Sequence, residues 1–132
     1  MYGMMKNLVF PGIKILIVED DVSSRIYLNK ILEKTGALLL NAGDGEEAVS
    51  MTYSDPDIKL ILMDIQLPVI DGYTAARRIK EVLPGIKIIA QTAYGMTGDM
   101  ENIIESGFDD YIVKPIFSNQ LIDLIKRHIQ QD

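Results

Sequence analysis

The sequence predicts an α/β fold: one doubly wound, five-stranded parallel sheet with five helices on its two faces. Five short apolar runs alternate with five longer amphipathic segments. Several runs are apolar at every position rather than at every second one, which is typical of parallel strands covered on both faces. Strand and helix repeated five times predict right-handed crossovers. The runs are residues 13–18, 38–41, 58–63, 86–90 and 111–113.

The first amphipathic segment predicts a helix between the first two runs. Four of its residues recur at helical spacing and share one stripe, and Gly36 follows them as a typical helix stop. The stripe consists of Ser24, Leu28, Ile31 and Thr35.

Polar starts and glycine or proline stops mark the other four helices. The second opens with the polar segment 44–49, and the third begins near Asp71 and stops before Pro84. The fourth covers about 97–106, where Gly107 follows as its stop. The fifth is expected to turn one stripe toward the sheet, made of Leu121, Leu124, Ile125 and His128.

Acidic residues follow two of the predicted strands. A sheet of this kind takes the flavodoxin-like strand order 2-1-3-4-5, and ligands bind where the order reverses, between strands 1 and 3. Glu19-Asp20-Asp21 follows the first run, Asp64 ends the third, and Lys114 closes the fifth. The fold therefore predicts one acidic crevice with a lysine beside it.

A Mg²⁺ site suits these acids. Mg²⁺ takes octahedral oxygen ligands, usually one or two protein carboxylates with water and phosphate oxygens. Asp20 and Asp64 are expected to bind the ion directly, while Glu19 acts through a water molecule. The backbone carbonyl of Gln66 is a further expected ligand. Asp21 has two open roles, metal contact and cap of the first helix.

Asp64 is also the expected phosphoryl acceptor. An aspartate can take a phosphoryl group when a metal ion and hydrogen-bond donors neutralise the developing charge. Lys114 would supply positive charge to the phosphoryl oxygens, and Thr92, at the end of the fourth strand, would supply a hydroxyl donor.

Two other chemistries fit less well. Phosphatases of the haloacid dehalogenase type need a second acid two residues after the nucleophile, where this chain has Gln66. Nucleotide and flavin modules bind phosphate through glycine-rich or Ser/Thr loops, whereas the loop after the first strand is Glu-Asp-Asp and the chain has no G-x-G-x-x-G motif.

Composition limits the partners and the domain count. With 132 residues the chain is expected to form one domain, and its net charge of −6 argues against nucleic acid or an anionic membrane as a partner. It contains no cysteine, which suits a reducing, cytoplasmic location. Residues 1–12, which end at Pro11-Gly12, are expected to be a linker or a cloning remnant, so the domain itself would cover 13–132.

Four motifs stand in order at domain-sized spacing, and together they resemble the bacterial response-regulator receiver domain over about residues 13–130. Each motif alone is weak, but the ordered set is very specific. The motifs are Val18-Glu19-Asp20-Asp21, Met63-Asp64 with the turn to Gly72, Thr92-Ala93, and Tyr111-Ile112-Val113-Lys114-Pro115.

The resemblance implies a phosphorelay. Asp64 would accept a phosphoryl group from a phospho-histidine on a kinase or a histidine phosphotransfer domain. Thr92 would then move toward the phosphoryl group and Tyr111 would turn inward, although a strand tyrosine is ordinarily packing. The domain would promote its own phosphorylation and dephosphorylation without being an enzyme otherwise. The peptide bond between Lys114 and Pro115 is expected to be cis.

The parent protein and its contacts are also expectations from the resemblance. Segments 64–73 and 91–99 resemble receivers of hybrid histidine kinases, with a free-standing single-domain regulator or a degenerate binding module as alternatives. A dimer is expected through helix 4, strand 5 and helix 5. The phosphodonor would dock on a surface formed by Ser24, Tyr27, Pro115 and Phe117.

Overall fold

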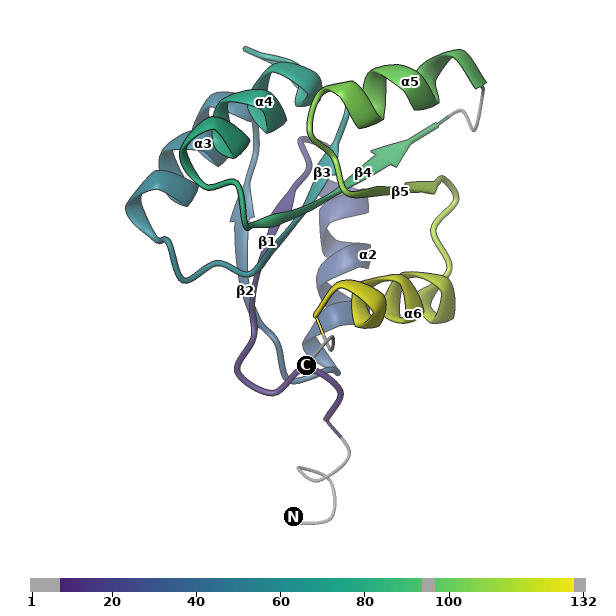
Figure 1. The fold of residues 1–132 in the computed structure, drawn as a ribbon. Helices are drawn as coiled ribbons and strands as arrows, with labels where there is room; N and C mark the ends of the chain where they lie inside the picture. Colours follow the sequence, from purple (N-terminus) through teal and green to yellow (C-terminus); the bar gives the residue numbers. More distant parts are fainter. Residues whose placement is uncertain (1–7, 94–96, 130–132) are drawn as a thin grey trace.

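The computed structural model describes residues 8–93 and 97–129, apart from the side chains of 97–100, and contains the predicted sheet. Five parallel strands follow the order β2-β1-β3-β4-β5, as Figure 1 shows. The flavodoxin-like prediction is therefore confirmed. The strands are β1 (Lys14–Val18), β2 (Leu38–Ala42), β3 (Leu60–Asp64), β4 (Lys87–Thr92) and β5 (Asp110–Val113).

Helices cover both faces of the sheet (Figure 1). One core joins the sheet to α2 and α6, and a second core joins its other face to α3, α4 and α5. Successive strand residues alternate between the two cores: Leu62 and Ile89 pack with α2 and α6, whereas Met63 and Ala90 pack on the other side. The helices are α2 (Val22–Glu33), α3 (Gly45–Ser54), α4 (Gly72–Val82), α5 (Thr97–Glu105) and α6 (Ser118–Ile129).

Three helices that leave the carboxyl edge of the sheet begin at an aspartate cap. The carboxylates of Asp21, Asp44 and Asp71 each accept a hydrogen bond from the backbone N–H three residues later. Such caps satisfy helix donors that have no partner within the helix. The predicted starts of α3 and α4 are thus confirmed.

The end of α2 differs from the predicted helical stripe. The helix ends at Glu33, so Thr35 lies beyond it. Thr35 is nevertheless buried, and its hydroxyl donates to the carbonyl of Leu32. Gly36 adopts a positive φ of 84°, which confirms it as the stop.

The packed domain begins before residue 13, which differs from the prediction of a linker over residues 1–12. Phe10 is only 1% exposed and belongs to the core of α2 and α6. Its N–H donates to the carbonyl of Thr35 (2.8 Å), and the N–H of Gly12 donates to the carbonyl of Gly36 (3.1 Å). Residues 1–7 lie outside the described residues. Within the described ranges, no helix has the length and apolarity to cross a membrane.

Candidate functional site

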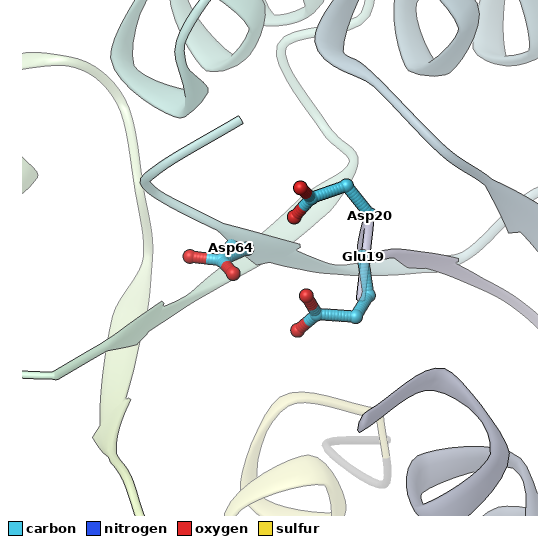
Figure 2. A group of neighbouring side chains, drawn as sticks. All are labelled: Glu19, Asp20 and Asp64. Carbon is cyan, nitrogen blue, oxygen red and sulfur yellow. The ribbon is translucent and has the colours of Figure 1, made fainter. Parts of the chain in front are cut away.

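Three carboxylates meet at the carboxyl edge of the sheet. Glu19 and Asp20 follow β1, Asp64 ends β3, and one oxygen from each lies within 4.8 Å of the others. Figure 2 shows the side chains of Glu19 and Asp20 reaching toward Asp64. Glu19 and Asp64 are buried while Asp20 is exposed, so the group opens to solvent on one side.

Lys114 pairs with two members of this group, Asp64 and Glu19. Its Nζ donates to Oδ2 of Asp64 (3.0 Å) and lies 3.6 Å from Oε1 of Glu19. Burial alone lowers the pKa of Lys114, but the hydrogen bond and the charge of Asp64, together with Glu19, raise it above its ordinary value. Lys114 is therefore an ammonium that faces two carboxylates.

The three carboxylates outnumber the one positive charge that faces them, Lys114. Burial, followed by repulsion from Asp64, raises the pKa of Glu19, although a hydrogen bond from the N–H of Asp21 and the charge of Lys114 oppose this. Oε1 of Glu19 is buried and has no hydrogen-bond partner among the described residues. An all-oxygen donor set with an unsatisfied carboxylate oxygen fits a hard divalent cation such as Mg²⁺.

Asp21 takes the capping role rather than a place in the carboxylate group. Its Oδ2 accepts from the N–H of Ser24 (2.8 Å), and this hydrogen bond lowers the pKa of Asp21. The three-carboxylate group found among the described residues consists of Glu19, Asp20 and Asp64 without it. Of the two roles open at the sequence level, the cap is the one that the geometry supports.

A cleft of about 280 Å³ opens beside Asp64. Thr92, which ends β4 and is 6% exposed, lines this cleft with Asp64 and Lys114. The backbone N–H of Gln66 donates to Oδ1 of Asp64 (3.0 Å). The fold therefore brings together the predicted acceptor, lysine, hydroxyl and metal-binding acids.

Tyr111 lies outside that cleft. It is partly buried on β5 beside Ala90 and packs on the core of α3, α4 and α5. Two residues that the sequence did not single out do line the cleft, Gln91 and Tyr73. Tyr73 follows Gly72 at the start of α4, whereas Gln91 could be placed only from the pairing of β3 with β4.

A second pocket, of about 260 Å³, lies between α2 and the loop from β5 to α6. The four residues predicted for the partner surface, Ser24, Tyr27, Pro115 and Phe117, all line it. The Tyr27 hydroxyl donates to the carbonyl of Ile116 (2.6 Å), which ties the two walls together. The peptide bond between Lys114 and Pro115 is cis, as predicted.

Gly72 fixes the backbone beneath the acceptor. A Cβ atom at this position would lie 2.5 Å from the carbonyl oxygen of Asp64 and 2.8 Å from Cα of Ile65, closer than such atoms approach. The N–H of Gly72 donates to the carbonyl of Ile65 (2.8 Å). Only glycine therefore allows α4 to begin against the end of β3.

Comparison with known proteins agrees with this geometry. The family model described as the response regulator receiver domain matches residues 15–126, most of the chain. The chain belongs to the response regulator receiver family. It is thus a receiver domain of the two-component phosphorelay type.

Similar proteins include receivers within longer chains. A hybrid signal transduction histidine kinase I of Dictyostelium discoideum is 36% identical over 124 residues, which cover 88% of this receiver but only 7% of the kinase. The receiver thus spans a small part of that relative.

Solved structures also match. The receiver of sensor histidine kinase PA1611 from Pseudomonas aeruginosa, with magnesium coordinated in its active-site cleft, is 35% identical with a TM-score of 0.84, covering 91% of this chain and 99% of that one. The receiver domain of Ssk1 from Saccharomyces cerevisiae, crystallised with the histidine phosphotransfer protein Ypd1, gives 32% identity, a TM-score of 0.85 and coverage of 91% and 90%.

Proposed function

We propose that this receiver accepts a phosphoryl group from a phospho-histidine onto Asp64. The observation that carries the proposal is the buried Asp64 carboxylate, bonded by Lys114 at 3.0 Å and grouped with Glu19 and Asp20. In the transfer, an oxygen of Asp64 attacks phosphorus and the bond from phosphorus to the imidazole nitrogen breaks. The electron pair of that bond stays on the imidazole.

Asp20, Asp64 and the backbone carbonyl of Gln66 would hold Mg²⁺, with Glu19 acting through water. When bound, the ion would neutralise charge on the phosphoryl oxygens. Lys114 would hold one phosphoryl oxygen by a charge-assisted hydrogen bond, and the Thr92 hydroxyl would donate to another. The PA1611 receiver, with magnesium in the same kind of cleft, supports this assignment.

The switch of the proposal involves Thr92 and Tyr111. Contacts between Thr92 and the phosphoryl group would favour a second packing of β4 and β5, with Tyr111 turned inward. The ring of Tyr111 is partly buried beside Ala90, and this position supports a proposed change in its packing. Hydrolysis of the acyl phosphate by water would return Asp64 and free phosphate, an activity that the domain itself would promote.

The phosphodonor would dock on the pocket between α2 and the loop from β5 to α6. The side chains of Tyr27 and Phe117 are 48% and 55% exposed, so they offer apolar surface beside Lys114. Apolar surface of this kind often marks a docking site. The complex of the Ssk1 receiver with Ypd1 supports a histidine phosphotransfer domain or a kinase as the partner.

The parent protein of the proposal is a hybrid histidine kinase, because a hybrid kinase is among the similar proteins. A free-standing regulator would use the same chemistry. A dimer would form through α5, β5 and α6, where Asp110, Asp123 and Arg127 line a hollow of about 430 Å³ and supply charges of both signs.

Intact-protein mass after incubation with acetyl phosphate or phosphoramidate tests the proposal. With Mg²⁺, the wild type should gain one phosphoryl group, and Asp64→Asn should gain none while keeping its fold. Asp57→Asn, which changes an exposed acid at the opposite edge of the sheet, serves as the control and should label fully. Full labelling of Asp64→Asn would refute the assignment. Mg²⁺ binding without any labelling would favour a receiver that acts only as a binding module.

A further inference from the structure

Gln91 carries a polar group that the fold buries and leaves unused. It stands on β4 next to Thr92, and its side chain is 1% exposed. Its Nε2 has no hydrogen-bond partner among the described residues. Native folds contain few such groups because an unpaired buried N–H is destabilising, so each one calls for an explanation.

The side chain of Gln91 lies beside the phosphoryl acceptor. The register of β3 and β4 pairs Gln91 with Asp64, on strands that run about 4.8 Å apart. Leu62 and Ile89, two residues earlier on each strand, both pack with α2 and α6, so alternation points Asp64 and Gln91 to that same face. Gln91 also lines the cleft of Asp64.

The metal ion does not explain this group. An N–H donor cannot bind a cation, whereas the other unpaired buried atom of the described chain, Oε1 of Glu19, is an acceptor that a cation or Lys114 can satisfy. Nε2 of Gln91 therefore has no acceptor within reach among the described residues of the resting domain.

Asp64 receives no hydrogen bond from Gln91 at rest. Its Oδ2 already accepts from Lys114 and its Oδ1 from the N–H of Gln66. Phosphorylation would add phosphoryl oxygens to Asp64, and Lys114 would move toward one of them. The other phosphoryl oxygens would be new acceptors next to Gln91.

We propose that Nε2 of Gln91 donates a hydrogen bond to the acyl phosphate on Asp64, an acceptor that exists only in the phosphorylated receiver. This inference rests on the proposed function and adds a donor from β4 to Lys114 and Thr92. A hydrogen bond to a charged group favours the loaded state, and its loss should weaken that state about tenfold.

Beryllofluoride, a phosphoryl mimic, tests the contact through Gln91→Met, which keeps the side-chain length but cannot donate. With Mg²⁺ present, we expect the apparent Kd for beryllofluoride to rise about tenfold. The Kd for Mg²⁺ alone should be unchanged, and the free energy of unfolding of the free domain should not fall. Thr52→Val, which replaces another buried polar side chain far from the cleft, is the control and should bind as the wild type does. Equal beryllofluoride affinities for Gln91→Met and the wild type would overturn the proposal.

A second measurement uses the wild type, so it does not depend on a variant that folds. The side-chain amide protons of Gln91, assigned by triple-resonance NMR, should shift downfield when Mg²⁺ and beryllofluoride are added together, and not with Mg²⁺ alone. The absence of that shift would overturn the proposal.

A third result would also overturn the proposal. If Gln91→Met slowed phosphoryl transfer from a protein phosphodonor but left beryllofluoride binding unchanged, the amide would serve docking of the phosphodonor.

Failure of the proposed function gives a different result. In that case neither the wild type nor Asp64→Asn would bind beryllofluoride or be labelled by acetyl phosphate. The inference on Gln91 would then be rejected together with the proposed function. A wild type that binds beryllofluoride while the Gln91 amide does not respond rejects the inference on Gln91 alone.

Discussion

Two of the lysine–aspartate pairs in this receiver, Lys80 with Asp109 and Lys114 with Asp64, have similar distances but different surroundings. Lys80 on α4 donates to Oδ2 of Asp109 (2.8 Å) and to the carbonyl of Ile86 (2.6 Å), and the same Asp109 oxygen accepts from the N–H of Ile88 (2.8 Å). One lysine meets one carboxylate there, and backbone groups complete the network. Such a pair holds α4 against the sheet.

The pair of Lys114 with Asp64 is left incomplete. One lysine faces Asp64 and Glu19, which are grouped with Asp20, while Glu19 and Gln91 each keep a buried atom without a hydrogen bond among the described residues. A balanced network stabilises the resting fold, whereas an unbalanced one gains stability when a cation and an anion bind. The contrast teaches that unmet charge, rather than the presence of an ion pair, marks the site.

The largest difference should appear when one of the site's acids is removed. Asp20→Asn should weaken Mg²⁺ binding by at least about 10–100-fold, the loss seen when even indirect ligands are changed. The same variant should be more stable than the wild type without metal, because less repulsion remains. Thermal unfolding during a Mg²⁺ titration measures both effects, with Asp57→Asn as the control. Unchanged Mg²⁺ affinity would contradict the role of Asp20.

Removal of each lysine should then separate the two pairs. Lys80→Met should lower the free energy of unfolding by about 1–3 kcal/mol with or without Mg²⁺, since it leaves polar groups unpaired. Lys114→Met should destabilise the metal-free protein and recover when Mg²⁺ is added, because the cation replaces the lost charge. Urea unfolding with and without Mg²⁺ gives the comparison. Equal responses of both variants to Mg²⁺ would mean that the pairs do not differ as described.

A smaller effect is expected in the loop between β3 and α4, at a residue that carries no charge. Val69 has a φ of 73°, a region that β-branched residues rarely adopt, and its side chain is 74% exposed. Val69→Asn should stabilise the domain by about 1 kcal/mol, because asparagine tolerates this conformation and no packing is lost. The urea midpoint measures the gain. A loss of stability would show that Val69 makes a contact worth more than its strain.

The smallest effect should come from a half-exposed pair at the opposite edge of the sheet. The hydrogen bond from Lys14 (2.8 Å) lowers the pKa of Asp55 below its ordinary value. This stabilisation is present above the ordinary pKa of aspartate and is lost as the pH falls through the lowered pKa. The Tm of Asp55→Asn should thus lie below that of the wild type at neutral pH and approach it in acid. A difference in Tm that is constant with pH would exclude the ion pair as its cause.

The sequence predicted the parts of the receiver that depend on strand ends. Asp64 and Lys114 directly follow or end apolar runs, and parallel strands bring such ends to one edge whatever their exact register. The pair Asp71-Gly72 likewise marked the start of α4, where Asp71 is the N-cap. These features depend on local patterns and on one topological rule.

The features that the sequence did not predict depend on contacts between distant segments. Phe10 lies in a short segment beside Pro11 and Gly12, without any periodicity, and its side chain is buried because it packs in the core of α2 and α6. Gln91 is one polar residue in a strand, and only the register with β3 places it beside Asp64. A pattern within one segment cannot contain that information.

The close contact of Gly72 with the end of β3 has a mechanical consequence. Because α4 begins directly against the carbonyl of Asp64, the backbone beneath the acceptor has no room to shift toward that helix. Phosphorylation would then leave the backbone under Asp64 in place. Any displacement of the backbone would occur at the opposite wall of the cleft, where Gln91 and Thr92 end β4. The close contact at Gly72 would thus direct any displacement toward β4, on the other side of Asp64.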